Sequence, residues 1–278
     1  MPQWEKEKIV VENTKNPNTR TSLVKDLKKL GLKEGDIVIV HSSMSKLGWT
    51  VGGSPTIIDA LIECVGETGT ISMPAHSSGN GDPELWQCPA VPKAWWPIIR
   101  EETPPFRVDI TPTERIGQIP ETFRKYPGVL RSYHPSVSFT AFGKDANYIT
   151  ETHPLEKPFG KESPLDKLYQ LNAKILLLGV DHSSNTSLHY AEWIADIPNF
   201  PQIPRGAAVL ENGKRVWKTW TEFDYDSEDF AQLGLEFEKS TNYEPRVVGQ
   251  AESRLLNMRD IVDFGINWLQ KNRNYTRS

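Results

Sequence analysis

The segment of residues 173–193 constrains the fold more than any other part of the chain. It opens with an apolar run at residues 175–178, which is typical of a buried parallel strand. Gly179 ends the run, a polar turn follows, and Asn185 or Thr186 is placed to cap a helix. Because a strand that leads through a polar loop into a helix is the repeating unit of α/β proteins, we expect an α/β fold.

The helix that follows this loop carries two side chains with acid–base chemistry. His189 and Glu192 are three residues apart, so they lie on one face of a helix. An imidazole can act as a base near neutral pH, and a nearby carboxylate raises its basicity and fixes its orientation. The pattern favours a site that uses both side chains, but a helix whose His and Glu merely face solvent fits the spacing equally well.

A second candidate strand delivers polar side chains in the same way. Residues 37–40 are β-branched throughout and lead directly into His41, Ser42 and Ser43. Ligands in open α/β sheets bind at the carboxyl ends of the strands. The sequence therefore predicts that this polar turn contributes to a binding site. A further short strand is expected at residues 69–74.

A glycine-rich turn precedes the next helix, for which Ser54 is the predicted N-cap and Gly66 the C-cap. Its free backbone N–H groups favour an anion such as a phosphate, and Arg115 and Arg131 are candidates to neutralise one. The turn has neither the Walker ending nor the G-x-G-x-x-G pattern, so an ordinary turn remains an alternative. Other expected elements are helices at 21–32, 113–126, 227–239 and 257–271 and a hairpin that turns at Asn212-Gly213.

Composition limits the possible partners and compartments. The 278 residues could form one large α/β domain or two small ones. No linker is obvious, so we expect an N-terminal arm at 1–20 and a single domain at 21–278. The net charge of −4 does not suggest a nucleic-acid partner. Cys64 and Cys88 are too few for a disulfide framework or a thiolate zinc site, and no two histidines have metal-ligand spacing. The charged start lacks a signal core, so a cytoplasmic protein without membrane or metal partners is expected.

Four motifs together resemble a known family. They are V-H-S-S-x-S-x-L-G-W-x-x-G-G at residues 40–53, T-P-T-x-R-x-G-Q-I at 111–119, R-S-x-H-P at 131–135, and L-L-L-G-V-D-x-x-S-x-T-x-x-H-x-A-E at 176–192. In order and spacing they resemble the aminoglycoside 3-N-acetyltransferases, with the likeness closest to Bacillus-type and environmental members. The pyrophosphate loop of the GNAT acetyltransferases is absent.

The resemblance implies a fold, a reaction and a set of site residues. The fold would be a three-layer α/β/α arrangement around a mixed, largely parallel sheet, with a C-terminal hairpin and helices. The reaction would transfer acetyl from acetyl-CoA to the 3-amino group of a 2-deoxystreptamine antibiotic. His189 would be the catalytic base, Thr186 would lie near the thioester carbonyl, and Glu192 would orient the imidazole or receive the antibiotic. The residues implied for the CoA channel are His41, Ser42, Ser43, Leu47, Gly48, Pro74, Thr113, Arg115 and Gly117.

A polycationic acceptor needs carboxylates. The candidates are Glu192, Asp181, Asp82 and Asp224, although each could equally be an exposed acid without a ligand. The Pro-, Gly- and Trp-rich loop at residues 75–96 is expected to set the choice of acceptor.

Two other functions remain open. The first is a serine hydrolase with Ser42 or Ser43 as nucleophile and His189 as base, although the G-x-S-x-G elbow is absent. The second is a protein that binds CoA but transfers nothing, or that acylates another amine. Either a monomer or a homodimer is compatible with the sequence.

Overall fold

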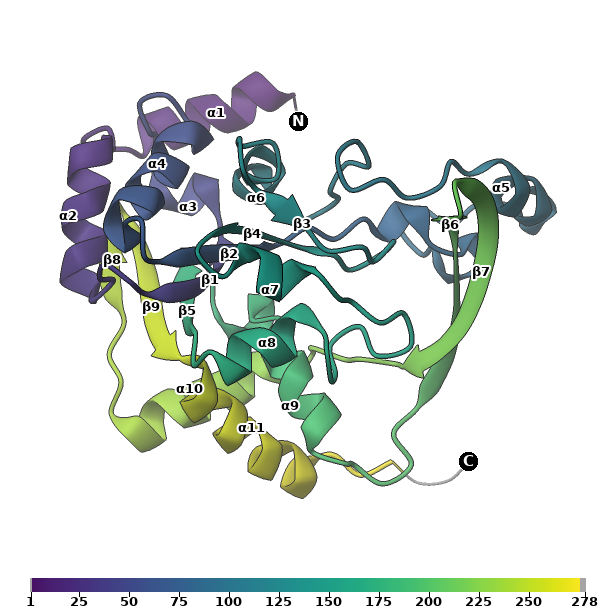
Figure 1. The fold of residues 1–278 in the computed structure, drawn as a ribbon. Helices are drawn as coiled ribbons and strands as arrows, with labels where there is room; N and C mark the ends of the chain where they lie inside the picture. Colours follow the sequence, from purple (N-terminus) through teal and green to yellow (C-terminus); the bar gives the residue numbers. More distant parts are fainter. Residues whose placement is uncertain (1, 276–278) are drawn as a thin grey trace.

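A computed structural model describes residues 2–275, and its centre is a seven-stranded sheet with the order β3-β4-β2-β1-β5-β9-β8 (Figure 1). A separate two-stranded sheet is formed by β6 and β7. The strands are β1 (Ile37–Ser42), β2 (Thr70–Pro74), β3 (Leu130–Arg131), β4 (Phe139–Gly143), β5 (Lys174–Leu178), β6 (Gln202–Glu211), β7 (Lys214–Phe223), β8 (Arg246–Val248) and β9 (Ala251–Asn257).

The helices lie on both faces of the large sheet, and this confirms the predicted three-layer arrangement. The α-helices are α1 (Gln3–Glu12), α2 (Arg20–Leu30), α3 (Met44–Leu47), α4 (Ser54–Val65), α5 (Trp96–Glu102), α6 (Gln118–Phe123), α7 (Ala146–Thr150), α8 (Pro164–Gln170), α9 (Leu188–Ile194), α10 (Phe230–Thr241) and α11 (Met258–Asn272). Short 3₁₀ turns are η1 (Ser78–Asn80), η2 (Pro83–Leu85), η3 (Lys93–Trp95) and η4 (His182–Ser184).

Alternating side chains of the central strands divide the interior into two cores. Val38 and Val40 of β1 pack with α2, α4 and α6, whereas Ile39 packs with the core on the opposite face, under α8, α9 and α11. In β5, Leu176 and Leu177 point to opposite faces in the same way. Successive strand residues point to opposite faces of a sheet, so strands with two apolar faces hold both helix layers.

The strand order creates a crevice at one edge of the central strands. β1 is parallel to β2 on one side and to β5 on the other, so the connections that leave the central strands run to opposite sides of β1. In open α/β sheets this topological switch point is where ligands bind, outside the carboxyl ends of the strands. Within residues 2–275 the other pairs of the large sheet are antiparallel, so the sheet is less parallel than expected.

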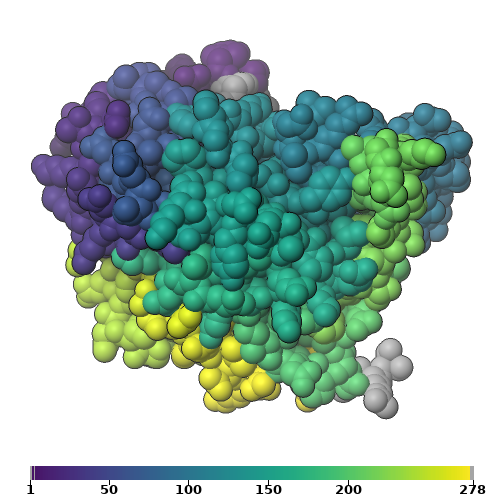
Figure 2. Space-filling model, in the orientation of Figure 1, coloured from purple at the N-terminus to yellow at the C-terminus, as the bar shows by residue number. Residues whose placement is uncertain are grey.

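The hairpin of β6 and β7 stands beside the segment that follows β2. Asn212 and Gly213 form its turn with φ values of +50° and +75°, as the Asn-Gly signal predicts. Arg215 of the hairpin donates to the carbonyls of Arg100 and Thr103. In Figure 2 the green hairpin accordingly lies against the blue segment that contains α5.

Several predicted element ends were wrong, and local hydrogen bonds explain them. Gly53 rather than Ser54 is the N-cap of α4, and the Ser54 hydroxyl instead lies 2.8 Å from that of Thr122. The last residue before α9 is Ser187, because Asn185 and Thr186 belong to the preceding turn. Gly66 does end α4, with a φ of +64°.

Three longer segments also differ from expectation. The N-terminal arm holds α1, and the loop at 75–96 holds η1, η2 and η3. The helix expected at 113–126 is shortened to α6 because Gly117, with a φ of +88°, precedes it. β8 and β9, which lie between the last two helices, were not predicted. No helix within residues 2–275 is both long and apolar enough to cross a membrane.

Candidate active site

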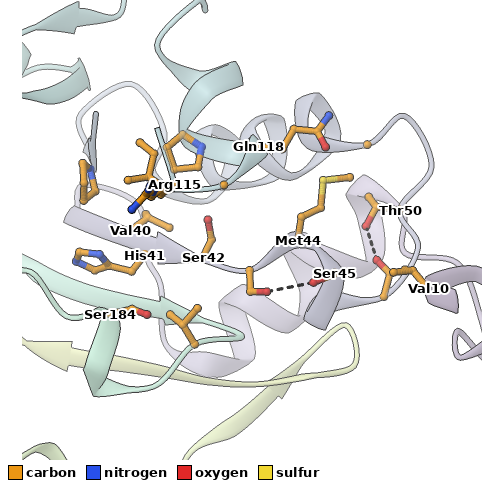
Figure 3. A pocket seen from close by; sticks show the side chains of 18 of the residues that line it. Val10, Val40, His41, Ser42, Met44, Ser45, Thr50, Arg115, Gln118 and Ser184 are labelled. Atoms are coloured by element: carbon orange, nitrogen blue, oxygen red, sulfur yellow. Dashed lines mark hydrogen bonds between the residues drawn. The ribbon is translucent and has the colours of Figure 1, made fainter. Parts of the chain in front are cut away.

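A cavity of about 1080 Å³ opens at the carboxyl ends of the central parallel strands. His41 and Ser42 line it from the end of β1, Pro74 from the end of β2, and Val180 from just beyond β5. Figure 3 shows His41, Ser42 and Ser184 around this space. The cavity therefore lies at the switch point that the strand order creates.

Most of the residues expected in the CoA channel line this cavity. They are His41, Ser42, Ser43, Gly48, Pro74, Arg115 and Gly117. The catalytic candidate Thr186 also lines it, beside Ser184. The four sequence motifs are far apart along the chain, and three of them meet here because β1, β5 and the loop before α6 converge at one edge of the sheet.

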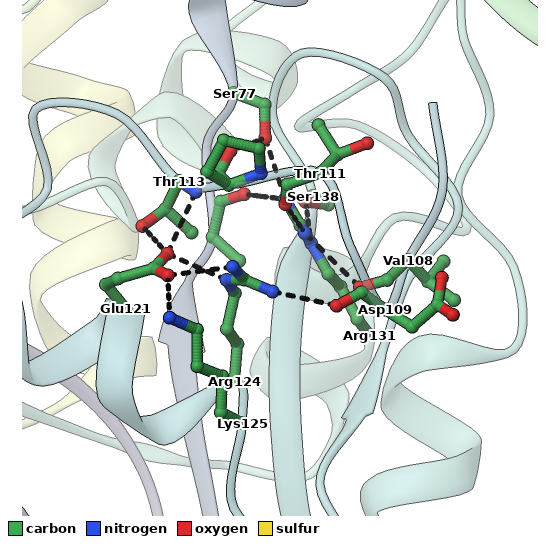
Figure 4. Close-up of polar contacts among 12 residues, drawn as sticks. Ser77, Val108, Asp109, Thr111, Thr113, Glu121, Arg124, Lys125, Arg131 and Ser138 are labelled. Carbon is green, nitrogen blue, oxygen red and sulfur yellow. Dashed lines mark hydrogen bonds and ion pairs between the residues drawn. The ribbon is translucent and has the colours of Figure 1, made fainter. Parts of the chain in front are cut away.

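Leu47 and Thr113 do not line this cavity. Leu47 is fully buried in the core under α2 and α4. The Thr113 hydroxyl donates to Glu121 Oε2 at 2.7 Å, and Glu121 also pairs with Arg124 (Figure 4). Thr113 thus holds the loop before α6 rather than facing the cavity.

Arg131 is part of the framework and not a phosphate ligand. Its guanidinium donates to the carbonyls of Ala75 and Thr111 and to the hydroxyls of Ser77 and Ser138, as Figure 4 shows. These contacts join the strand ends around the cavity. Its guanidinium N–H groups are therefore already hydrogen-bonded within the protein.

Two features near the cavity mouth suit an anion. Arg115 reaches the cavity from a left-handed backbone with a φ of +59°, and its guanidinium donates to the carbonyl of Cys88. Residues other than glycine rarely adopt this backbone conformation, and those that do cluster at functional sites. Gly52 and Gly53 also line the cavity where α4 begins, so unpaired N–H groups at a helix N-terminus are close at hand.

The sequence analysis missed the contribution of α1. Lys6, Glu7 and Val10 of this helix line the cavity. The buried Asn18 anchors the arm, because its amide donates to Leu47 O at 2.8 Å and its backbone pairs with Thr50. Weak amphipathic patterning gave little sign of this helix in the sequence.

His189 and Glu192 form a direct pair close to His41 and His76 of the cavity wall, although neither residue of the pair lines the cavity itself. His189 Nδ1 donates to Glu192 Oε2, and the imidazole stacks on Phe159 with ring centroids 4.7 Å apart. The His189 side chain is 15% exposed. A carboxylate on Nδ1 fixes the tautomer that leaves Nε2 as the basic atom.

Glu192 is buried rather than exposed on an outward face. Its side chain is 0% exposed, and Oε1 accepts from Arg273 and from the backbone N–H of Asp226. A carboxylate that is occupied in this way can orient the imidazole but is not available to a cationic acceptor. Arg273 follows α11, 81 residues from Glu192, so no local sequence signal could have identified it.

Two further histidines lie close to this pair. His41 and His76 line the cavity, and a charge on His189 would lower the pKa of both. Burial already lowers the pKa of His41 and of His76 to about 3, so both are neutral at physiological pH. Among residues 2–275 their Nε2 atoms are buried without a hydrogen-bond partner. His76 lies two residues after the end of β2, so the strand-end rule could have found it.

The acidic candidates for an acceptor differ in availability. Asp82 is paired bidentately with Arg100 at 2.8 and 3.0 Å, so its charge is already neutralised. Asp181 caps η4, and the hydrogen bonds from Ser183 lower its pKa. The Asp224 side chain is 52% exposed, and Oδ1 lies 3.8 Å from Arg205 Nη2. A role for Asp181 or Asp224 in binding remains a prediction.

Metal ligation and disulfides have no support in the described part of the chain. Across residues 2–275 no three His, Cys, Asp or Glu side chains come together in a group that could hold a metal ion. Cys64 and Cys88 are both free, the first buried and the second exposed.

Comparison with known proteins identifies the family of this chain. The sequence matches the family described as aminoglycoside 3-N-acetyltransferase over residues 39–270. It is 47% identical to the aminoglycoside N(3')-acetyltransferase-like protein YokD of Bacillus subtilis, over 95% of this chain and 97% of that protein. It is 34% identical to aminoglycoside N(3)-acetyltransferase VII of Streptomyces paromomycinus, over 95% and 96%.

Solved structures of similar proteins have the same fold. The crystal structure of YokD superposes with a TM-score of 0.92, covering 95% of this chain and 98% of that one. A binary complex of AAC-IIIb with CoASH gives 0.84 at 34% identity, covering 95% and 100%. AAC-VIa bound to sisomicin gives 0.81 at 33% identity, covering 94% and 100%. The chain belongs to the aminoglycoside 3-N-acetyltransferase family, whose members are acyltransferases.

Proposed function

We propose that this protein transfers acetyl from acetyl-CoA to the 3-amino group of a 2-deoxystreptamine aminoglycoside, with His189 as the general base. The observation that carries the proposal is the buried His189–Glu192 pair next to a large cavity at the strand ends. Relatives of similar fold bind CoASH and sisomicin, and this supports the two substrates.

The proposed chemistry follows from the state of the acceptor amine. An aminoglycoside amine is mostly protonated at neutral pH, so a base must remove a proton as nitrogen attacks the thioester carbonyl. His189 Nε2 takes this proton while Glu192 stabilises the imidazolium through Nδ1. The new C–N bond forms, the C–S bond breaks, and the CoA thiolate leaves and is protonated. Direct transfer gains its advantage from holding both substrates together.

The tetrahedral intermediate needs hydrogen-bond donors for its oxyanion. The Thr186 hydroxyl is our candidate because it lines the cavity one helical turn before His189. Removing one donor of this kind typically costs about 100- to 1000-fold in kcat. CoA itself would occupy the cavity, with Arg115 and the N-terminus of α4 near its phosphates.

The hydrolase alternative finds less support in the geometry. A serine nucleophile requires a hydrogen bond to its histidine base. Ser43 Oγ instead lies 3.4 Å from Ser45 Oγ. Among residues 2–275, Ser42 Oγ is buried without a hydrogen-bond partner, and the His189 imidazole is bonded to Glu192. The alternative that the protein binds CoA without transferring acetyl is tested by the following assay.

The experiment is a thiol-release assay with acetyl-CoA against a panel of aminoglycosides, followed by mass spectrometry and NMR of the products. We expect a gain of one acetyl group on at least one member of the panel, located at the 3-amino nitrogen. CoA binding without any acetylated product would favour the non-catalytic alternative. Thiol release without an acetylated amine would indicate thioester hydrolysis.

A further inference from the structure

A buried arginine from the end of the chain is joined to the proposed base through its carboxylate. We propose that Arg273 is a positioning residue that holds Glu192 in place and sets the pH at which His189 becomes a base. This inference rests on the proposed function. It concerns a residue that approaches the site from outside the cavity, 84 positions along the chain from His189.

The contacts of Arg273 fix it firmly. Its Nη1 donates to Glu192 Oε1, its Nε donates to Asp229 Oδ2 at 2.7 Å, and its Nη2 donates to the carbonyl of Asp226 at 2.7 Å. The guanidinium carbon lies 5.8 Å from the ring centre of Phe230. Arg273 therefore ties the end of α11 to the start of α10 and to α9 at once.

Glu192 has little freedom in this arrangement. Arg273 and the Asp226 backbone occupy Oε1, so Oε2 is turned toward His189. Phe230 packs against the imidazole as well as beneath the guanidinium, with ring centroids 4.9 Å apart for the His189 pair. Loss of the guanidinium would free the carboxylate to rotate and would remove the charge that balances it.

The charges of this cluster predict the direction of the effect. Glu192, Asp229 and Arg273 together carry −1, so the cluster has a charge of −1 with neutral His189 and 0 with protonated His189. Removing the cation makes the cluster more negative, and the His189–Glu192 pair then retains its proton to higher pH. Removing the carboxylate of Asp229 has the opposite effect.

Other groups around the pair contribute a constant background. The titratable groups that face or influence it from other elements are His41, His76, Tyr225, Asp226, Asp229 and Tyr275. Burial holds the pKa of both histidines low and raises that of both tyrosines, so these four groups stay neutral around pH 7. Arg273 is itself fully charged there, because its pKa is raised by Asp229 and Glu192 against the effect of burial.

The experiment compares three variants by the pH dependence of kcat/KM. In Arg273→Gln we expect the acidic limb to move to higher pH by about one pH unit, which lowers activity about tenfold on that limb. Asp229→Asn should move the limb to lower pH. Arg273→Lys keeps the charge, so its acidic limb should lie close to that of the wild type. The matched control is Arg254→Gln, another buried arginine paired with glutamates, and it should leave the limb in place.

A second readout does not depend on turnover. The ring of His189 can be titrated by NMR, with its signals assigned by their loss in His189→Gln, and its apparent pKa should move in the same directions. Unchanged titration in folded Arg273→Gln and Asp229→Asn would overturn the inference. Turnover that persists in His189→Gln would instead overturn the proposed base, so the two failures are distinguishable.

Discussion

Two histidine–glutamate–arginine clusters in this structure have the same composition and different surroundings. His189 pairs with Glu192, which pairs with Arg273. His182 Nε2 donates to Glu238 Oε1 at 2.8 Å, and Glu238 pairs with Arg254. The ion pairs alone therefore do not distinguish a catalytic site from a structural one.

The two clusters differ in the solvent exposure of their histidine side chains. The His182 side chain is 1% exposed, and burial lowers its pKa despite the hydrogen bond to Glu238. His182 also packs directly against Gly234 of α10. The His189 side chain is 15% exposed, and its backbone N–H donates to the carbonyl of Thr186, a residue that lines the cavity. A histidine base therefore needs one ring nitrogen hydrogen-bonded to a carboxylate and the other ring nitrogen accessible to the substrate.

Among single substitutions, the largest effect on stability is expected when either carboxylate loses its charge. Glu238→Gln and Glu192→Gln each leave a buried arginine without a full partner, so each should lose about 3–5 kcal/mol of unfolding free energy. Only the Glu192 variant should also lower kcat per folded molecule. Denaturant unfolding and kcat, measured on the same preparations, check this. Equal loss of kcat in both variants would erase the distinction between the clusters.

The buried histidines predict a pH-dependent stability. Burial lowers the pKa of His41, His76 and His134 to about 3, so below about pH 6.5 the unfolded chain binds protons that the folded protein does not. Stability should therefore fall as pH drops from about 6.5 toward 3, with about 1.4 kcal/mol per pH unit from each histidine. Denaturant unfolding between pH 4 and pH 7 measures this slope. A flat profile over that range would contradict neutral burial.

The smallest effect concerns the helices packed behind the two clusters. A Cβ on Gly234 would lie 1.9 Å from His182 Cγ, whereas a Cβ on Gly265 would lie 3.2 Å from that of Ala191 in α9. Gly234→Ala should therefore cost about 1–3 kcal/mol by overpacking, and Gly265→Ala should cost less. Thermal unfolding of both variants tests the order. The reverse order would show that α11 packs more tightly on α9 than α10 packs on η4.

The sequence predicted the parts of this structure that depend on local patterns. The apolar run of β5, the β-branched run of β1 and the Asn-Gly turn each specify their element through nearby residues. The strand-end rule then placed His41 and Ser42 at the cavity. The resemblance supplied the proposed reaction and eight of the residues that line the cavity.

What the sequence did not predict depends on contacts between distant segments. Arg273 reaches Glu192 because α11 packs on α9, and β9 was missed because its partner residues in β5 lie 75 to 83 positions earlier in the chain. Asp82 reads as a free acid, but the fold brings Arg100 to it. Such pairings follow from tertiary packing, which periodicity does not encode.

The most direct test of the account is single-turnover acetyl transfer in His189→Gln and His182→Gln, with CoA affinity measured on both. We predict that His189→Gln loses about 100- to 10,000-fold in rate while it still binds CoA. The folded fraction of His182→Gln should transfer acetyl at a rate close to that of the wild type but unfold more readily. Near-normal transfer by His189→Gln would contradict the central claim that this histidine is the base.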